Sequence, residues 1–316
     1  MSKYLITGAT GYVGSMLLNQ IMKEGHKADV LVRNADRFSY KNATNIKIIS
    51  ADITDKEAIS NISEKYDYII HCAAPTRSAY MVSNPVEVIQ TIVNGTEHIL
   101  NLAYRCDVKS MIYLSSMEVY GQIECSKERR VTEDEQGYID VTNIRSCYPI
   151  AKLMAENLCH SYYKEYCVPV KIARLAQTFG RGVRPDENRV FAQFANAVRT
   201  SSDIVLHTEG NSMGNYCDID DAVEAILFIL KRGKNAEAYN VVNEKNTMII
   251  RDMAELVAGK IAKGKIKVIC NIQNESTSEY PADTGLRMSG EKLRRLGWEA
   301  KCDLEEMYKK MLDKAT

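Results

Sequence analysis

The chain has 316 residues, enough for one large or two small domains with a full apolar core. Its 41 basic and 41 acidic residues balance, so no global field favours nucleic acid or an anionic membrane as a partner. Nine cysteines without a CxxC pair favour reduced, mostly buried thiols over a disulfide framework or a zinc site, and we expect no bound metal. The N-terminus runs straight into an apolar strand pattern, and no apolar run approaches the ~20 residues of a membrane helix, so we expect a cytoplasmic protein.

The N-terminal half alternates short apolar runs with helical patterns. The predicted strands are 4–7, 28–32, 46–50, 68–71, 110–114 and 170–175, and the predicted helices begin near Gly14, Val86 and Tyr148. Strands that alternate with helices imply parallel βαβ units wound right-handed. This pattern predicts an α/β fold of the Rossmann type, with a doubly wound parallel sheet and ligands at the carboxyl ends of its strands.

Beyond residue 175 the pattern loosens. The predicted elements are a polar loop at 180–186, helices at 190–198, 220–230, 250–261 and 304–312, and strands at 204–206, 239–242 and 266–270. We see no internal repeat, low-complexity tract or linker in this half. The two halves therefore look interleaved and not joined by a tether.

Three glycines lie between the first predicted strand and the first predicted helix. Gly8, Gly11 and Gly14 have GxxGxxG spacing. Glycines in this position allow the tight turn, the approach of a pyrophosphate to the backbone, and the packing of helix on strand. The helix N-terminus then offers N–H groups and a positive dipole end to phosphate. The strand–turn–helix context favours a dinucleotide site over a merely structural turn.

A tyrosine and a lysine share one face of a later helix. Tyr148 and Lys152 are four residues apart, and an ammonium near a phenol lowers the phenol pKa toward neutrality. Ser116 ends the preceding strand, where a hydroxyl can hydrogen-bond the oxygen whose proton moves. Taken alone, a YxxxK spacing is also typical of an ordinary amphipathic helix with a surface Tyr and Lys. The upstream serines and the glycine loop favour a catalytic set.

Together these residues resemble the extended short-chain dehydrogenase/reductases of the NAD-dependent epimerase/dehydratase family. The resemblance covers nearly the whole chain. Its motifs are Thr7-Gly8-Ala9-Thr10-Gly11-Tyr12-Val13-Gly14, Asp52-Ile53, His71-Cys72-Ala73-Ala74, Asn94-Gly95-Thr96, Ser115-Ser116-Met117-Glu118-Val119-Tyr120-Gly121, Tyr148 with Lys152, Arg174-Leu175-Ala176-Gln177-Thr178-Phe179-Gly180, Asp220-Asp221 and Leu293-Arg294-Arg295-Leu296-Gly297-Trp298.

The resemblance implies a role for each matching residue. Tyr148 would take the proton from a sugar hydroxyl as hydride leaves to the nicotinamide, Lys152 would bind the nicotinamide ribose, and Ser116 would orient the substrate oxygen. Asp52 is as readily a turn-forming residue as a contact to adenine. The expected cofactor-binding residues are Gly8, Thr10, Gly11, Tyr12, Val13, Gly14, Arg33, Asp52, Ile53, Ala73, Ala74, Tyr148 and Lys152.

Within the family, the sequence around these motifs most resembles that of the UDP-glucuronate decarboxylases. Arg145-Ser146-Cys147-Tyr148 matches their active-site tyrosine context. Glu118 stands where these enzymes and the sugar 4,6-dehydratases carry a glutamate, which in the dehydratases takes the C5 proton. Met117 replaces the aspartate that serves the dehydratases as acid. The expected substrate-binding residues are Tyr80, Ser115, Ser116, Gln177, Arg181 and Arg189.

Three departures from the family pattern concern substrate and cofactor. Gln177 replaces a usual asparagine, and Gly214 replaces an arginine that binds the substrate diphosphate. Arg181, Arg184 and Arg189 are candidates to replace that arginine, because Arg suits bidentate phosphate binding. The alternative is that they are solvated loop charges. The second strand ends at Arg33 with no acidic residue for the ribose hydroxyls. Arg33 suits a 2′-phosphate, so the cofactor is NADP or NAD, with NADP favoured.

The interpretation is an enzyme that oxidises a hydroxyl of a nucleotide-linked sugar to a transient ketone. Glu118 joins the catalytic set because, on a continued strand, a residue two positions beyond Ser116 would point to the same face as the serine. One alternative is a net NADPH-dependent reductase of a nucleotide-linked keto-sugar or ketose. A second is a non-catalytic NAD(P)-binding regulatory protein. We expect an NAD(P)-binding domain at 1–175, to which 215–245 returns, a smaller substrate-binding α/β domain at 176–316, and a homodimer formed through 86–104 and 148–164.

Overall fold

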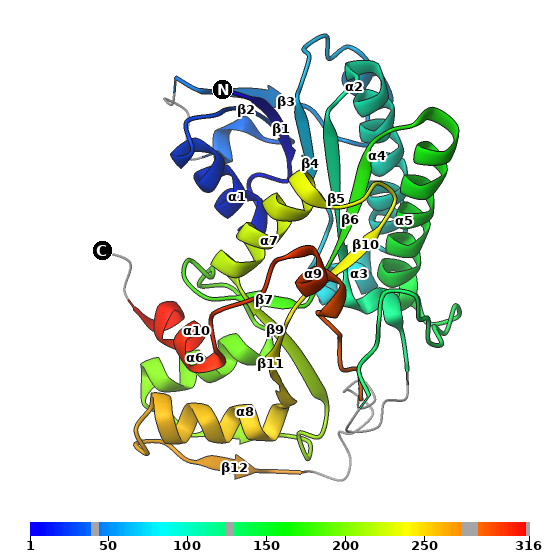
Figure 1. Cartoon of the computed structure of the whole chain (residues 1–316). Coiled ribbons are helices and arrows are strands. Elements are labelled where there is room, and N and C mark those ends of the chain that lie inside the picture. The colour runs from blue at the N-terminus through cyan, green and yellow to red at the C-terminus, as the bar shows by residue number, and fades with distance from the viewer. Residues whose placement is uncertain (39–43, 124–128, 273–283, 314–316) are drawn as a thin grey trace. The chain divides into compact units, whose positions relative to one another are not determined.

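The computed structural model describes residues 1–38, 44–123, 129–272 and 284–313. It divides into two compact units whose segments interleave along the sequence (Figure 1). The first unit holds Met1–Gly121, Tyr138–Leu175 and Val223–Tyr239, and the second holds Gln122–Gly137, Ala176–Ala222 and Asn240–Thr316. Of the returning segment expected at 215–245, only 223–239 falls in the first unit, while 122–137 falls in the second.

A seven-stranded sheet forms the centre of the first unit. Its strand order is β10-β6-β5-β4-β1-β2-β3, and the neighbouring pairs from β6 to β3 are parallel. The order reverses beside β1, which gives the doubly wound topology that the alternating pattern predicts. The strands are β1 (Lys3–Thr7), β2 (Lys27–Val32), β3 (Ile46–Ser50), β4 (Tyr68–His71), β5 (Ser110–Ser116), β6 (Val170–Leu175) and β10 (Ala238–Val241).

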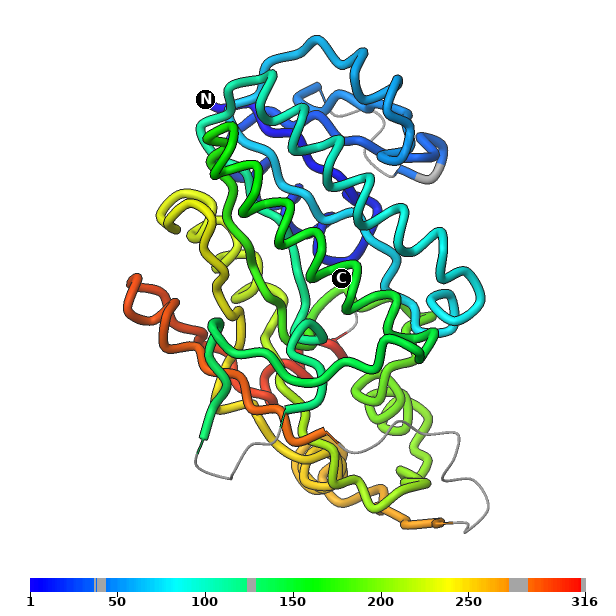
Figure 2. Tube along the Cα trace, turned by 90° about the vertical axis from the view of Figure 1, so that its right-hand side faces the viewer, coloured from blue at the N-terminus to red at the C-terminus, as the bar shows by residue number. Residues whose placement is uncertain are grey.

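Two long helices cover one face of this sheet. In both views α4 (Pro85–Cys106) and α5 (Cys147–Tyr166) lie side by side (Figures 1 and 2). Their inner residues, such as Ile92, Ile99 and Ala155, share one apolar core with the sheet residues Leu5 and Met111. The other helices of this region are α1 (Tyr12–Lys23), α2 (Lys56–Ser60), α3 (Ser78–Ser83), α7 (Ile219–Arg232) and the 3-10 turns η1 (Ala35–Arg37), η2 (Met117–Tyr120) and η3 (Ile144–Ser146).

A buried polar cluster fastens α4 to the sheet. His71 shares hydrogen bonds with Thr7 Oγ1 at 2.7 Å through Nδ1 and with Thr96 Oγ1 at 3.2 Å through Nε2. Burial lowers the pKa of His71 to about 3, so the ring is neutral at physiological pH. The same Thr7 hydroxyl accepts from the backbone N–H of Ala73. This cluster gives Thr7, His71 and Thr96 a structural role within three of the sequence motifs.

The second unit has two small sheets and its own apolar core. A three-stranded sheet runs β11-β9-β7, with β9 antiparallel to β11 and parallel to β7, and β12 pairs with β8. Stacked Phe179 and Phe191 rings, with centroids 4.4 Å apart, lie within this core. The elements are β7 (Gln177–Phe179), β8 (Ile204–Leu206), β9 (Met213–Asp218), β11 (Asn243–Ile249), β12 (Val268–Cys270), α6 (Val190–Thr200), α8 (Ile250–Leu256), the π-helix η4 (Val257–Ile261), α9 (Glu291–Leu296) and α10 (Leu304–Leu312).

The structure corrects two expectations about local conformation. Residues after Ser116 do not continue the strand, because Met117–Tyr120 forms a 3-10 turn capped by the Ser116 hydroxyl. The rule that alternate residues share a face therefore does not relate Glu118 to Ser116. The helix expected at 250–261 is α-helical only to Leu256 and then widens into a π-helix.

Candidate active site

The glycine loop has the geometry that a pyrophosphate site requires. Gly8 has a positive φ of 71°, and a Cβ there would lie 2.8 Å from the backbone nitrogen of Ala73. A Cβ at Gly14 would collide with the carbonyl oxygen of Gly8. Helix α1 follows with Gly11 as its N-cap, a residue that has no side chain to cap the first turn. The residues present therefore fit a dinucleotide, whose phosphates would meet the α1 N-terminus.

Other residues expected to bind the cofactor also make structural contacts within the protein. Asp52 Oδ1 accepts from the Thr54 backbone nitrogen at 2.9 Å and from the Thr54 hydroxyl at 2.8 Å. Asp52 therefore forms a local turn, which was one of the two roles considered for it from the sequence. Ile53 is buried in the core beneath α4. Ala73 adjoins Gly8 and is half-buried, as is Ala74. These positions place the carboxyl ends of β1 and β4 around the glycine loop.

Lys152 carries a buried charge beside Tyr148. Its Nζ donates to the Leu114 carbonyl oxygen at 2.7 Å and lies 5.8 Å from the centroid of the Tyr148 ring and 4.7 Å from that of Tyr113. Burial lowers the pKa of Lys152 to about 8, while the negative charge of Glu156 acts in the opposite direction. The structure thus brings together Tyr148, Lys152 and the carboxyl end of β5.

The two adjacent serines of β5 have different surroundings. Ser116 is half-buried and its Oγ accepts from the Glu118 backbone nitrogen at 3.2 Å. Ser115 is buried, and its hydroxyl donates to Glu156 Oε1 at 2.5 Å. Ser115 therefore points toward α5, whereas Ser116, the last residue of β5, caps the 3-10 turn that follows.

Sequence reasoning missed the buried ion pair behind Ser115. Arg174, at the end of β6, donates to Glu156 of α5 through NH2 at 2.7 Å and Nε at 3.0 Å, and both side chains are almost fully buried. The signal was available, because Glu156 follows Lys152 by four residues and so shares its helix face. This pair ties α5 to the carboxyl ends of β5 and β6.

Arg145 is a second residue whose role the sequence left unassigned. One terminal nitrogen, NH2, lies 3.0 and 2.9 Å from the two carboxylate oxygens of Glu118. Its Nε donates to Ser78 Oγ at 2.8 Å, and its guanidinium carbon lies 5.7 Å from the Tyr148 ring centroid. Three separate elements, η2, α3 and α5, thus meet at one guanidinium.

Arg33, at the end of β2, lies beside helix α4. Its NH1 is 3.7 Å from Glu87 Oε1, and the side chains are 70% and 48% exposed. Tyr80 also hydrogen-bonds Glu87, and this contact raises the pKa of the Tyr80 phenol. An acidic side chain is therefore present near the end of β2, although it comes from a different part of the chain.

The remaining expected substrate residues belong to the second unit. Arg181 Nε donates to Asp220 Oδ1 at 2.9 Å, and Arg189 NH2 donates to Glu187 at 2.7 Å. Gln177 begins β7 and is half-buried. Gly214 leaves the space that the Tyr216 ring occupies, so an arginine there would require the ring to move. Both arginines are exposed and carry local ion pairs.

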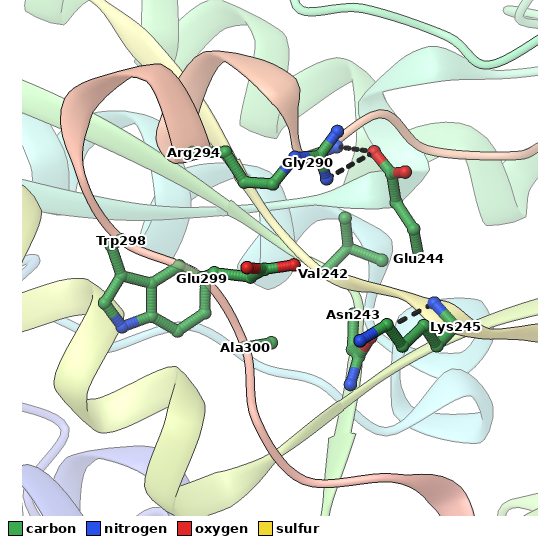
Figure 3. Close-up of a pocket in the computed structure, with 9 residues that line it drawn as sticks. All are labelled: Val242, Asn243, Glu244, Lys245, Gly290, Arg294, Trp298, Glu299 and Ala300. Atoms are coloured by element: carbon green, nitrogen blue, oxygen red, sulfur yellow. Dashed lines mark hydrogen bonds and ion pairs between the residues drawn. The ribbon is translucent and has the colours of Figure 1, made fainter.

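A small pocket in the second unit is lined by none of the expected site residues (Figure 3). Its volume of about 160 Å³ is below the roughly 300–1,000 Å³ usual for ligand pockets. Glu244 accepts there from Arg294 NH1 at 2.9 Å and from the Gly290 backbone nitrogen at 2.7 Å. We read it as a gap in the packing around the Leu293–Trp298 motif.

Comparison with known proteins decides the family. The family model described as the NAD dependent epimerase/dehydratase family matches residues 4–243. The chain belongs to this family. It is an extended short-chain dehydrogenase/reductase and an enzyme of the NAD-dependent epimerase/dehydratase type. The Rossmann-type fold expected from the glycine loop and the strand pattern is confirmed.

The curated relatives of this family member include nucleotide-sugar enzymes. UDP-glucuronic acid decarboxylase 6 of Arabidopsis thaliana is 28% identical over 314 residues, covering 96% of this chain and 86% of the relative. The dTDP-D-glucose 4,6-dehydratase of Mus musculus is 28% identical over 332 residues, covering 98% and 88%. The shared family is thus clear, while the particular reaction differs between relatives.

Solved structures show the same fold at lower identity. UDP-glucose 4-epimerase of Thermotoga maritima, solved with UDP-glucose, superimposes with a TM-score of 0.84 at 22% identity and covers 98% of this chain and 97% of its own. RMD of Pseudomonas aeruginosa, complexed with NADPH, gives a TM-score of 0.78 at 19% identity, covering 99% and 98%. Both nicotinamide cofactors, NAD and NADPH, occur among these neighbours.

Among the described residues, no three His, Cys, Asp or Glu side chains gather as a metal would require. Within the same ranges, no helix combines the length and apolarity needed to cross a bilayer. The described cysteines are free thiols, and Cys125 lies outside the described residues.

Proposed function

We propose that this enzyme oxidises one hydroxyl of a nucleotide-linked sugar to a transient ketone and then rearranges the sugar, with decarboxylation the first reaction to test. The observation that carries the proposal is the buried Lys152 ammonium, held by the Leu114 carbonyl beside the Tyr148 ring. A cation fixed next to a phenol stabilises the phenolate, which is the form that accepts a proton.

Each member of the set has a distinct task. Tyr148 accepts the hydroxyl proton, Lys152 stabilises the resulting charge state, and Ser116 orients the sugar oxygen. When bound, a nicotinamide cofactor supplies the hydride acceptor and later the hydride donor. Glu118 exchanges a proton with the sugar carbon beside the ketone. The 3-10 turn that carries Glu118 begins directly after Ser116 and is capped by its hydroxyl, which supports their joint action on one sugar.

The cofactor is NAD or NADP, and we propose NADP on the strength of Arg33. An arginine at the end of the second strand suits a 2′-phosphate, because guanidinium groups pair with phosphate in a two-pronged manner. Gly8, Thr10, Gly11, Tyr12, Val13 and Gly14 would hold the pyrophosphate, and Asp52, Ile53, Ala73 and Ala74 would border the adenine and nicotinamide ends. We assign Tyr80, Gln177, Arg181 and Arg189 to the nucleotide-sugar.

The decisive experiment offers the purified enzyme three nucleotide-sugars taken from the names of its relatives. UDP-glucuronate, dTDP-glucose and UDP-glucose are incubated with either cofactor, while absorbance at 340 nm and product masses are followed. We expect transient cofactor reduction and loss of carbon dioxide with UDP-glucuronate. Reduction without any rearranged product from all three sugars would contradict the proposal.

A second candidate is a net reductase that consumes external NADPH. Arg33 favours it, and so does Met117, which occupies the place of the dehydratase acid. Stoichiometric NADPH oxidation on a nucleotide-linked keto-sugar would identify this activity, because internal redox consumes no added cofactor. A non-catalytic regulatory role is the third reading, and any turnover that depends on Tyr148 would exclude it.

We also propose a cytoplasmic homodimer that serves polysaccharide biosynthesis. Apolar side chains of α4 and α5 are exposed, among them Ile89 (43%), Tyr104 (55%) and Met154 (47%). Two copies that pack these faces together would bury them. Light scattering on the wild type and on Met154→Asp tests this, and the variant should shift toward monomer.

A further inference from the structure

The guanidinium of Arg145 is fixed in place by neighbours on two sides. Its Nε donates to Ser78 Oγ at 2.8 Å, and NH2 reaches both oxygens of Glu118 at 2.9 and 3.0 Å. Its guanidinium carbon is 5.7 Å from the Tyr148 ring centroid. A guanidinium held at Nε is pre-organised, so less rotamer entropy is lost when its other nitrogens bind a ligand.

The pair that Arg145 makes with Glu118 is accessible to solvent. The Arg145 side chain is 29% exposed and that of Glu118 is 38% exposed. Exposed ion pairs of this kind contribute little to stability, because water solvates both charges when they part. The pair can therefore exchange, in contrast to the buried pair of Arg174 and Glu156, whose separation would leave charges without water.

We propose that Arg145 is the group that recognises a carboxylate of the sugar, and that Glu118 occupies its carboxylate-binding edge until such a substrate arrives. This inference rests on the proposed function, which puts a sugar ring beside Tyr148 and Ser116. Two carboxylates at one guanidinium edge repel each other, so a substrate carboxylate displaces that of Glu118. The matching substrate class is a nucleotide-linked uronic acid.

Displacement has a consequence for Glu118. Released from Arg145, its carboxylate is free to turn toward the sugar carbon where a proton is exchanged. A neutral sugar provides no replacement charge for Arg145, so Glu118 stays paired with it. Arg145 thus selects uronic acids twice, first through direct pairing and again through the release of Glu118.

A purely structural tether predicts different behaviour. If Arg145 served only to join η2, α3 and α5, its replacement would weaken every ligand equally and lower the melting temperature. The two readings are separated by a pair of ligands that differ in one group, because UDP-glucuronate carries a carboxylate where UDP-glucose carries a hydroxymethyl group.

The experiment measures binding of UDP-glucuronate and UDP-glucose by calorimetry to the enzyme with its oxidised cofactor bound, in a Tyr148→Phe background that blocks turnover. Arg145→Gln should weaken UDP-glucuronate binding about tenfold to a hundredfold, the range for a hydrogen bond to a charged group, and leave UDP-glucose nearly unchanged. Arg145→Lys, which keeps the charge, should recover part of the loss. Glu118→Gln should tighten UDP-glucuronate binding several-fold, because the competing charge is gone.

The outcomes that overturn the inference are distinct from those that overturn the function. Equal losses on both ligands in Arg145→Gln, or weaker UDP-glucuronate binding in Glu118→Gln, would contradict carboxylate recognition and leave the proposed function standing. Binding of neither nucleotide-sugar to the Tyr148→Phe enzyme would overturn both. Ser78→Ala is the control that keeps both charges, and it should weaken UDP-glucuronate less than Arg145→Gln does. Should Arg145→Gln fail to fold, Arg145→Lys and Glu118→Gln decide the question.

Discussion

The Lys152 ammonium donates a 2.7 Å hydrogen bond to the carbonyl oxygen of Leu114. Burial lowers its pKa from 10.5 to about 8, so the folded chain holds this proton less tightly than the unfolded chain does. Stability then rises with pH between about 8 and 10.5, where the unfolded chain binds more protons. We expect wild type to gain stability relative to Lys152→Met over this window, measured by urea unfolding at pH 7.5 and at higher pH.

Lys171 offers a matched control at the other end of the sheet. It is also buried, and burial lowers its pKa from 10.5 to about 8. Its Nζ donates to Ser110 Oγ at 2.8 Å, near the start of β5 and away from Tyr148. Lys171→Met should therefore show the same pH dependence of stability but keep its turnover, whereas Lys152→Met should lose turnover. Equal turnover in the two variants would contradict the catalytic role of Lys152.

Tyr148 is the proposed proton acceptor. Removing its hydroxyl in Tyr148→Phe should lower turnover about 10²–10⁴-fold, the contribution of a positioned acid or base. The ring remains, so cofactor affinity in a fluorescence titration should stay within a few-fold of wild type. Lys152→Ala should weaken both properties. Normal turnover of Tyr148→Phe on the true substrate would show that the mechanism is misassigned.

Local patterns predicted the first unit well for physical reasons. Parallel strands buried on both faces appear as apolar runs, and the predicted strands 68–71 and 170–175 coincide with β4 and β6. The sheet topology followed from right-handed βαβ connections. In the second unit, β9 has the sequence MGNYCD, whose Gly214 and Asn215 hide the strand pattern. Burial of Tyr216 and pairing with β11 and β7 form this strand, and these are tertiary contacts.

At the site, the contacts that could not be predicted from the sequence join residues that lie far apart in the chain. Tyr148 and Lys152 are four residues apart on one helix, so their proximity was predictable. Glu118 and Arg145 meet across 27 positions of the chain, and Arg33 and Glu87 are further apart still. No spacing rule joins such pairs. In addition, Met117–Tyr120 forms a 3-10 turn, so the strand geometry used to predict the direction of the Glu118 side chain does not apply.

Glu118 decides between internal redox and plain reduction. Glu118→Gln should still reduce the cofactor transiently on substrate but release little rearranged product, because the proton exchange at carbon is lost. Incorporation of solvent deuterium at carbon should fall in parallel. A plain reductase needs Ser116, Tyr148 and Lys152 alone, so its NADPH consumption would survive this change. Unchanged rearrangement in the variant would remove Glu118 from the role of base.

The buried pair of Glu156 and Arg174 should matter for stability. Arg174→Met leaves the Glu156 carboxylate buried with its charge unpaired, which costs roughly 3–5 kcal/mol in unfolding free energy. Ser115→Ala removes one hydrogen bond to the same carboxylate, and we expect a smaller loss of about 1–2 kcal/mol. Urea unfolding followed by circular dichroism measures both. A loss below that of Ser115→Ala in Arg174→Met would show that the pair contributes little.

We expect cofactor choice to depend on Arg33 and on its neighbour Glu87. The Arg33 NH1 lies 3.7 Å from Glu87 Oε1, so a 2′-phosphate must compete with Glu87 for this guanidinium. Glu87→Gln removes the competitor and should tighten NADP⁺ about fivefold, the upper range for an exposed ion pair, with NAD⁺ nearly unchanged. Arg33→Asp should reverse or abolish the preference, because a carboxylate repels the phosphate and accepts from ribose hydroxyls. Fluorescence titrations of both cofactors measure these ratios. If wild type binds NAD⁺ as tightly as NADP⁺ and Glu87→Gln leaves the ratio unchanged, Arg33 does not read the 2′-phosphate.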